Sequence, residues 1–225
     1  MPNDSTARNI DFQPSDIRRA SIANHISVLT DIYKEDVNIA VWQNQLPEAV
    51  LADVDAIMIE SKRLQVKVSV TPTDVIEELL ASAYQLKEQK ALCDYIKLLV
   101  DMFCTLFEIK NVGLRLAILD QAMCPKFHVD KIPCRLVTTL SGIGTQWLPE
   151  DQVDRSKLGI GSLGLPDSTS GIMRNQTSIK NMSVGDVSLL KGEGWYNNEN
   201  NGAVHRSPAL SSNERRLLLT LDFID

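Results

Sequence analysis

Three side chains in the second half of the chain have the types and the order of a metal site. His128 and Asp130 lie two residues apart in the segment CPKFHVDKIPCRLVTT, and His205 follows in GAVHRSP. Residues i and i+2 of a β-strand point to the same face, so on a strand His128 and Asp130 would project together, either as a hydrogen-bonded pair or as two metal ligands. Two histidines and one carboxylate are the facial ligand set of non-haem Fe(II), which leaves coordination positions open.

The elements that must position these residues change in character near residue 110. From Thr73 to Ile109, apolar residues recur at helical spacing, which predicts two amphipathic helices separated by the polar break KEQK. Asp74 and Glu77 have the spacing of an N-terminal cap and its partner. Upstream, VNIAVWQ predicts a strand and EAVLADVDAIMIES predicts a helix.

After residue 110, short β-type runs replace the helical period. Clusters of Gly, Pro, Asn and Asp separate the runs VGLRLAIL, CRLVTTL, TQWL, SIKNMSV, DVSLL, GAVHRS and RRLLLTLDF. The stretch 157–176 predicts a long mobile loop between strands. We therefore predict an α+β chain with a helical support over residues 1–110 and an all-β core over residues 111–225.

Composition and charge exclude several classes of partner. The chain has 225 residues and is 44% hydrophobic, enough to bury a full core, and its formal net charge of −6 gives no basic stripe for nucleic acid. No apolar run approaches membrane-spanning length, and the segment MPNDSTARNIDFQPSDIRRA lacks the apolar core of a signal peptide. We expect a cytoplasmic protein that binds neither nucleic acid nor membranes. Four cysteines without C-x-x-C spacing argue against a zinc ribbon.

With its motifs in this order, the sequence resembles the Fe(II)/2-oxoglutarate-dependent dioxygenases, whose core is a double-stranded β-helix of the jelly-roll or cupin type. In that family, an H-x-D motif, a distal histidine on a later strand and a basic residue on the last core strand follow one another. The resemblance covers roughly residues 111–225, and CPKFHVDKIPCRLVTTLSGIGTQWL is similar to a bacterial branch of the superfamily. It implies that His128, Asp130 and His205 bind Fe(II), with 2-oxoglutarate as cosubstrate.

The family's basic residue binds the distal carboxylate of 2-oxoglutarate, and Arg215 and Arg216 both have the right distance from His205. Strand alternation separates these two arginines. Arg215 is in phase with the apolar set Leu217, Leu219, Leu221 and Phe223, whereas Arg216 is in phase with the mixed set Leu218, Thr220 and Asp222. A mixed set is typical of a face toward a polar cavity. We therefore predict that Arg216 binds the carboxylate, since a guanidinium offers it two parallel donors.

The resemblance implies an oxidation coupled to the conversion of 2-oxoglutarate to succinate and CO₂. The acidic chain argues against polynucleotides and favours a small molecule, an amino acid or a peptide as substrate. A second anchor for the cosubstrate is expected on an early strand, where Thr138 and Thr139 are the candidates. The stretch 149–176 is the expected lid.

Other interpretations explain part of the same pattern. A non-enzymatic, cupin-like metal-binding or sensory protein linked to zinc homeostasis would keep the three ligands, with zinc in place of iron, and need no arginine for 2-oxoglutarate. A cupin isomerase or thiol oxygenase is a weaker alternative, because thiol oxygenases favour three histidines and the β-rich half contains two. His128 and Asp130 could also be a surface pair, and Arg216 a solvated edge charge.

Overall fold

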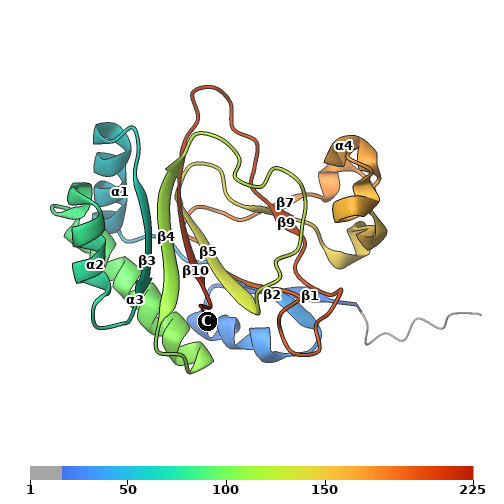
Figure 1. Ribbon diagram of the computed structural model, residues 1–225, viewed down its shortest axis with the longest axis horizontal. Coiled ribbons are helices and arrows are strands. Elements are labelled where there is room, and N and C mark those ends of the chain that lie inside the picture. The colour runs from blue at the N-terminus through green and yellow to red at the C-terminus, as the bar shows by residue number, and fades with distance from the viewer. Residues whose placement is uncertain (1–16, 225) are drawn as a thin grey trace, which may run out of the picture.

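A seven-stranded sheet forms the centre of the computed structural model, which describes residues 17–224 (Figure 1). Its strand order is β1-β2-β8-β5-β10-β4-β3. All neighbouring strands are antiparallel except β1 and β2. The strands are β1 (Arg19–Ala23), β2 (Val37–Trp42), β3 (Gln65–Val70), β4 (Val112–Leu119), β5 (Cys134–Ser141), β8 (Val187–Lys191) and β10 (Arg216–Asp222).

A second, smaller sheet covers the inner face of the large one. It contains β7 (Lys180–Asn181), β6 (Gln146–Trp147) and β9 (His205–Arg206) in that order, and an isolated bridge between His128 and His205 extends it. From β4 to β10, the chain passes back and forth between the two sheets, by way of the His128 bridge after β4 and with β6 and β7 as a consecutive pair in the small sheet, which is the winding of a double-stranded β-helix. Apolar side chains of both sheets fill the space between them: Ile39, Val41, Val137, Leu190 and Leu218 from the large sheet, and Trp147 and Met182 from the region of the small one.

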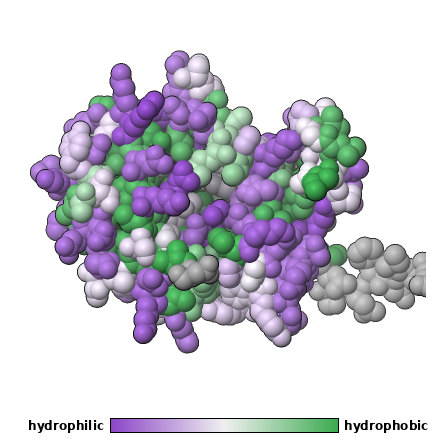
Figure 2. All heavy atoms as spheres, in the orientation of Figure 1, coloured by the Kyte–Doolittle hydropathy of each residue, from purple (hydrophilic) through white to green (hydrophobic). Residues whose placement is uncertain are grey.

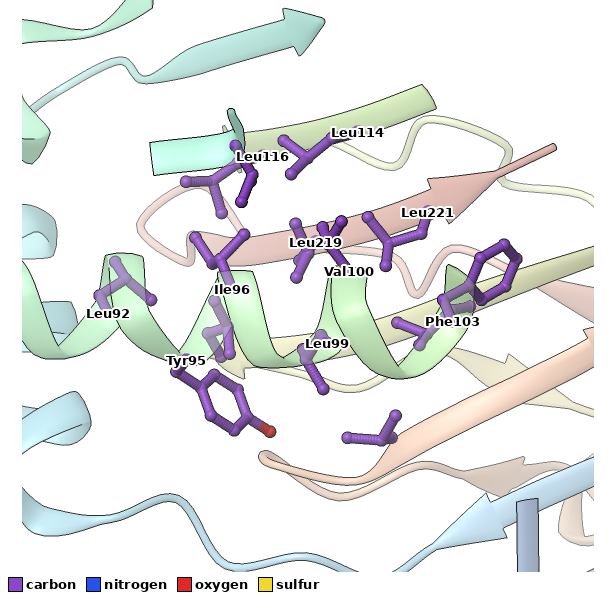
Figure 3. Packing of buried hydrophobic residues seen from close by; sticks show 14 of the residues in the cluster. Leu92, Tyr95, Ile96, Leu99, Val100, Phe103, Leu114, Leu116, Leu219 and Leu221 are labelled. Carbon is purple, nitrogen blue, oxygen red and sulfur yellow. The ribbon is translucent and has the colours of Figure 1, made fainter. Parts of the chain in front are cut away.

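Helices cover the outer face of the large sheet. They are α1 (Glu48–Glu60), α2 (Val75–Ser82) and α3 (Lys90–Phe107), with the 3₁₀ helices η2 (Ile26–Tyr33) and η3 (Tyr84–Leu86) beside them. Figure 3 shows the buried face of α3 against the leucines of β4 and β10: Leu92, Ile96, Leu99, Val100 and Phe103 meet Leu114, Leu116, Leu219 and Leu221. This burial explains the helical spacing of apolar residues in the sequence, because only one stripe of α3 faces the sheet.

The part of the chain before residue 110 does more than support the sheet. The predicted strand at VNIAVWQ and all three predicted helices are confirmed, but β1, β2 and β3 also extend the large sheet at its two edges. Asp74 is the N-cap residue of α2, as predicted, but the expected capping bond of its side chain is absent. The Asp74 carboxylate accepts a hydrogen bond from the backbone N–H of Thr71, before the helix, and makes no capping bond to the first turn of α2.

The predicted mobile loop at 157–176 is instead part of an ordered lobe of short helices, the helical lobe, which spans residues 150–178. These are η4 (Glu150–Gln152), η5 (Arg155–Lys157), η6 (Gly159–Ser162), α4 (Asp167–Ser170) and η7 (Gln176–Ser178). Ile172 from this lobe packs with Phe127, Leu148 and Val204 in a small apolar cluster, which attaches the lobe to the segments beside the small sheet. Its outer surface is partly apolar (Figure 2). Ile160 is 94% exposed and Leu163 is 81% exposed.

The described residues test the expectation about membrane-spanning helices but not the expectation about a signal peptide. Between residues 17 and 224, no helix has both the length and the apolar character to cross a membrane. Residues 1–16, on which the expectation of a missing signal peptide mostly depends, lie outside the described residues.

Candidate metal centre

His128, Asp130 and His205 come together between the two sheets. Their ligand atoms all lie within 4.8 Å of one another. Asp130 Oδ1 is 3.7 Å from Nε2 of His128, and Asp130 Oδ2 is 3.5 Å from Nε2 of His205. The three residues that the sequence analysis singled out therefore form one cluster of two imidazole nitrogens and a carboxylate.

The segment around His128 is not the strand that its sequence suggested. Apart from the single bridge, residues 124–133 have no strand structure. Pro125 and Pro133 bound the segment, and proline has no N–H to donate to a sheet. The bridge itself is regular, because the backbone N–H of His128 donates to the His205 carbonyl at 3.0 Å and the reverse bond is also 3.0 Å. It sets the two imidazoles side by side, with ring centroids 4.5 Å apart.

Both histidines present the nitrogen that a metal needs. Nδ1 of His128 lies 3.0 Å from the Lys126 carbonyl, and Nδ1 of His205 lies 3.0 Å from the Ala203 carbonyl. A carbonyl only accepts, so each Nδ1 carries the proton and each Nε2 directs a lone pair toward Asp130. Burial lowers the pKa of His205 to about 4, which keeps this imidazole neutral near neutral pH.

Asp130 is held by an arginine that the sequence analysis did not identify. Arg135 NH1 donates to Asp130 Oδ2 at 2.8 Å, while its Nε and NH2 donate to the two oxygens of Asp222 at 2.6 and 3.1 Å. Arg135 and Asp222 are directly opposite each other on β5 and β10. Glycine at position 192 lets the segment that contains Asp130 and Ile132 pack closely against it, because a Cβ there would lie 2.1 Å from the Ile132 carbonyl oxygen.

Arg216 faces the inner side of the large sheet, as the alternation of its strand predicts. Its side chain is 1% exposed, and its NH2 donates to the hydroxyls of Thr139 and Thr145. Nε and NH1 are buried without a partner among residues 17–224. Burial lowers the pKa of Arg216 to about 10, so the side chain remains a cation at neutral pH. A Cβ at Gly142, where φ is +87°, would lie 2.9 Å from the Arg216 Cα, so glycine permits this close approach.

Arg215 points to the other side of β10, where its guanidinium donates to the carbonyls of Met58 and Ser61 at the end of α1. Thr138 and Thr139 also separate by strand phase, since Thr139 contacts Arg216 and Thr138 is paired with Leu219 of the outer set. Of the two threonines named from the sequence, Thr139 is therefore the one beside the buried arginine.

A single cavity connects the metal cluster to the arginine's neighbours. Its lining includes His128, His205, Arg135, Thr145, Thr220 and Asp222. Apolar side chains of Val137, Leu190 and Leu218 also line it. The cavity thus combines metal-binding groups, hydrogen-bond donors and an apolar wall, which is the composition of small-molecule sites.

Comparisons with known proteins place the chain by family and by fold. A family model described as "Protein of unknown function (DUF1826)" matches residues 23–222. No curated protein matches the chain. Among solved structures, the rice dioxygenase for auxin oxidation has a TM-score of 0.53 and 10% identity, over 92% of this chain and 83% of that one.

Two further solved structures are similar at lower scores. Dioxygenase for auxin oxidation 1 from Arabidopsis thaliana, in its 2-oxoglutarate complex, has a TM-score of 0.48 and 10% identity, over 93% of this chain and 94% of that one. A Pseudomonas putida prolyl-4-hydroxylase has a TM-score of 0.42 and 12% identity, over 88% of this chain and 98% of that one.

The likeness to the rice dioxygenase, at 10% identity, speaks for the fold alone. It agrees with the path of the chain between the two sheets and confirms the double-stranded β-helix fold that the sequence predicted. The family-model match covers nearly the whole described chain, from residue 23 to residue 222, and so the chain belongs to the DUF1826 family.

Proposed function

We propose that this chain is a non-haem Fe(II)/2-oxoglutarate-dependent oxygenase that acts on a small molecule, an amino acid or a peptide. His128, Asp130 and His205 would hold the iron. The donor set supports this assignment, because two neutral imidazoles and one carboxylate are the ligands of non-haem Fe(II) sites. Bound Fe(II) and 2-oxoglutarate would supply the oxidising chemistry through decarboxylation of the cosubstrate to succinate.

The observation that carries the proposal is the burial of Arg216 without a carboxylate partner among residues 17–224. Arg216 is a fully buried cation with two unpartnered nitrogens, and no carboxylate within residues 17–224 forms an ion pair with it. An unpaired buried charge is costly, so a site that keeps one is suited to an anionic ligand. We assign this role to the distal carboxylate of 2-oxoglutarate, with Thr139 and Thr145 orienting the guanidinium.

The remaining residues of the site would position and protect the reactants. The Nδ1 hydrogen bonds of the two histidines hold their rings in the orientation that directs Nε2 inward. Arg135 holds Asp130 through one oxygen, Oδ2, which leaves Oδ1 for the metal. The apolar wall of Val137, Leu190 and Leu218 would keep water from the reacting groups.

The test is anaerobic addition of Fe(II) to the purified protein, with and without 2-oxoglutarate. We expect a metal-to-ligand charge-transfer absorption only when both are present. Arg216→Gln should retain Fe(II) and bind 2-oxoglutarate more weakly by about 2–5 kcal/mol, the usual cost of removing one partner of a buried charge pair. Arg215→Gln is the matched control, because the Arg215 guanidinium donates to carbonyls at the end of α1, on the outer side of the sheet. This variant should leave 2-oxoglutarate affinity unchanged.

Other results would assign the site differently. Metal binding with no response to 2-oxoglutarate in the wild-type protein would refute the oxygenase proposal and favour a metal-binding or sensory role. Tighter binding of Zn(II) than of Fe(II), again without a 2-oxoglutarate effect, would point to zinc as the native metal. Loss of 2-oxoglutarate affinity in Arg215→Gln but not in Arg216→Gln would contradict the assignment of the carboxylate site.

A further inference from the structure

A second arginine on the inner face of the large sheet has a buried nitrogen without a partner among residues 17–224. Arg115 is on β4, where Val112, Leu114 and Leu116 belong to the outer apolar cluster, so alternation directs Arg115 to the inner side. It lines the same cavity as His128 and His205. Its Nε is buried and has no hydrogen-bond partner in the described chain.

The other charges around the cavity are already neutralised by neighbours. Arg135 is shared between Asp130 and Asp222, and Arg206 donates to Asp167 at 2.8 Å. Within residues 17–224, Arg115 forms no ion pair with any carboxylate, although the whole chain is acidic, with a net charge of −6. Arg115 therefore differs from Arg135 and Arg206, which line the same cavity and form ion pairs.

Lys67 adds a second positive charge at the same place. It is directly opposite Arg115 in the register of β3 and β4, and both residues line a groove that shares Arg115, Arg135 and Asp222 with the cavity. Like charges directly opposite on neighbouring strands destabilise a sheet. An anion between them would relieve this repulsion.

The proposed cosubstrate does not account for this charge. One carboxylate of 2-oxoglutarate would bind the metal and the other Arg216, which leaves Arg115 without an anion. We infer that Arg115, assisted by Lys67 at the groove, binds a carboxylate group of the substrate, and that the substrate is a small carboxylic acid. This inference rests on the proposed function, because it takes Arg216 as the site of the cosubstrate.

The experiment compares acids with their neutral amides. Protein loaded with Zn(II), which is redox-inert, and 2-oxoglutarate is titrated with phenylacetate and phenylacetamide, and with hexanoate and hexanamide, by ligand-observed NMR. We expect at least one acid to bind more tightly than its amide by about 10- to 100-fold, the range of a hydrogen bond to a charged group. Arg115→Gln should abolish this preference, and Arg115→Lys should retain part of it.

Two further variants complete the design. Lys67→Gln should reduce the preference by a smaller factor, since Lys67 is exposed. Arg174→Gln is the matched control, because Arg174 is an exposed arginine that lines a different groove, on the helical lobe. It should bind the acids like the wild type.

Each other outcome overturns the inference in a recognisable way. If Zn(II) and 2-oxoglutarate bind but no acid is preferred over its amide, or if the preference survives in Arg115→Gln, the substrate assignment is wrong and the proposed function stands. If Arg115→Gln weakens 2-oxoglutarate itself, Arg115 belongs to the cosubstrate site. If the wild type binds metal but not 2-oxoglutarate, the proposed function fails first, and the inference fails with it.

Discussion

The two faces of the seven-stranded sheet use the same strands for opposite purposes. On the outer face, Leu217, Leu219 and Leu221 of β10 are fully buried under the helices. On the inner face, the alternate residues Arg216 and Thr220 of that strand are polar and buried. Thr220 lines the cavity of the metal cluster, and Arg216 donates to Thr145, which lines it too. Stability and ligand binding therefore depend on neighbouring residues that point in opposite directions.

This contrast explains why the inner face contains so many groups that are costly to bury. The outer cluster is large and almost wholly apolar, and its burial is the dominant source of folding free energy. The inner face contains partly unpaired cations at Arg115 and Arg216. Mutations on the outer face should thus change the free energy of unfolding, and mutations on the inner face should change ligand affinity.

The largest expected effect is on the inner face, at the metal ligands. His128→Ala and Asp130→Ala should each weaken Fe(II) binding by more than the roughly 10- to 100-fold that usually follows the loss of a group supporting a ligand. The fold should persist, because the outer cluster is untouched. Isothermal titration with Fe(II) under anaerobic conditions measures the affinity, and circular dichroism checks the fold.

His25→Ala is the control for that experiment. His25 is exposed, and its Nδ1 lies 2.8 Å from the Ser27 hydroxyl, away from the metal cluster. Its substitution should leave Fe(II) affinity unchanged. Wild-type affinity in both His128→Ala and Asp130→Ala would show that the cluster is not the metal site.

The sequence predicted those features of the site that depend on local spacing. Alternation along a strand is a local rule, so Arg215 and Arg216 could be assigned to opposite faces of β10 without knowledge of its neighbours. The helical period of α3 was equally readable, because its buried stripe is wide and continuous. The residue types of the metal cluster and their order along the chain were also visible.

Features that depend on register between distant segments were not predictable from one sequence. Arg135 meets Asp222 only because β5 and β10 pair in one particular register, and Lys67 meets Arg115 for the same reason on β3 and β4. The segment of His128 looked like a strand from its composition, but its flanking prolines restrict it to a single bridge. A register is set by the total packing of the two sheets, which no short pattern contains.

Substitutions of buried leucines on the outer face should lower the free energy of unfolding without weakening metal binding. Leu219→Ala should lower the free energy of unfolding by about 2–5 kcal/mol, because it leaves a cavity under α3. Urea denaturation measures this change, and the folded variant should bind Fe(II) like the wild type. Leu98→Ala, at an α3 position that is 52% exposed, should change stability by less than about 0.5 kcal/mol. Equal effects at both positions would mean that the outer face is not the main core.

A smaller effect on Fe(II) affinity is expected for Arg135, which donates hydrogen bonds to both Asp130 and Asp222. Arg135→Gln removes the donor to Asp130 and should weaken Fe(II) binding by about 10- to 100-fold. Arg135→Lys should retain part of the affinity, because lysine keeps the positive charge but cannot donate two parallel hydrogen bonds to Asp222. Arg155→Gln, which breaks an ion pair with Glu150 in the helical lobe, should leave it unchanged. An unaltered affinity in Arg135→Gln would show that Asp130 needs no support.

The smallest effect concerns Lys191, a charged exception on the outer side of β8. It is 2% exposed, its Nζ donates to the Lys34 carbonyl, and it lies 5.0 Å from the centre of the Trp195 ring. Burial lowers its pKa from 10.5 to about 8, so between these two pH values the unfolded chain binds a proton that the folded chain does not. By linkage, this group makes stability rise with pH across that window, by on the order of 1–3 kcal/mol.

Other groups titrate there too, including the buried Cys93 thiol, whose raised pKa acts in the opposite direction. The measurement is therefore the difference in unfolding free energy between wild type and Lys191→Met at pH 7.5 and at about pH 10, the two ends of the window over which linkage acts. The difference should shift in favour of the wild type at the higher pH, and a difference that is independent of pH would show that Lys191 keeps its ordinary pKa.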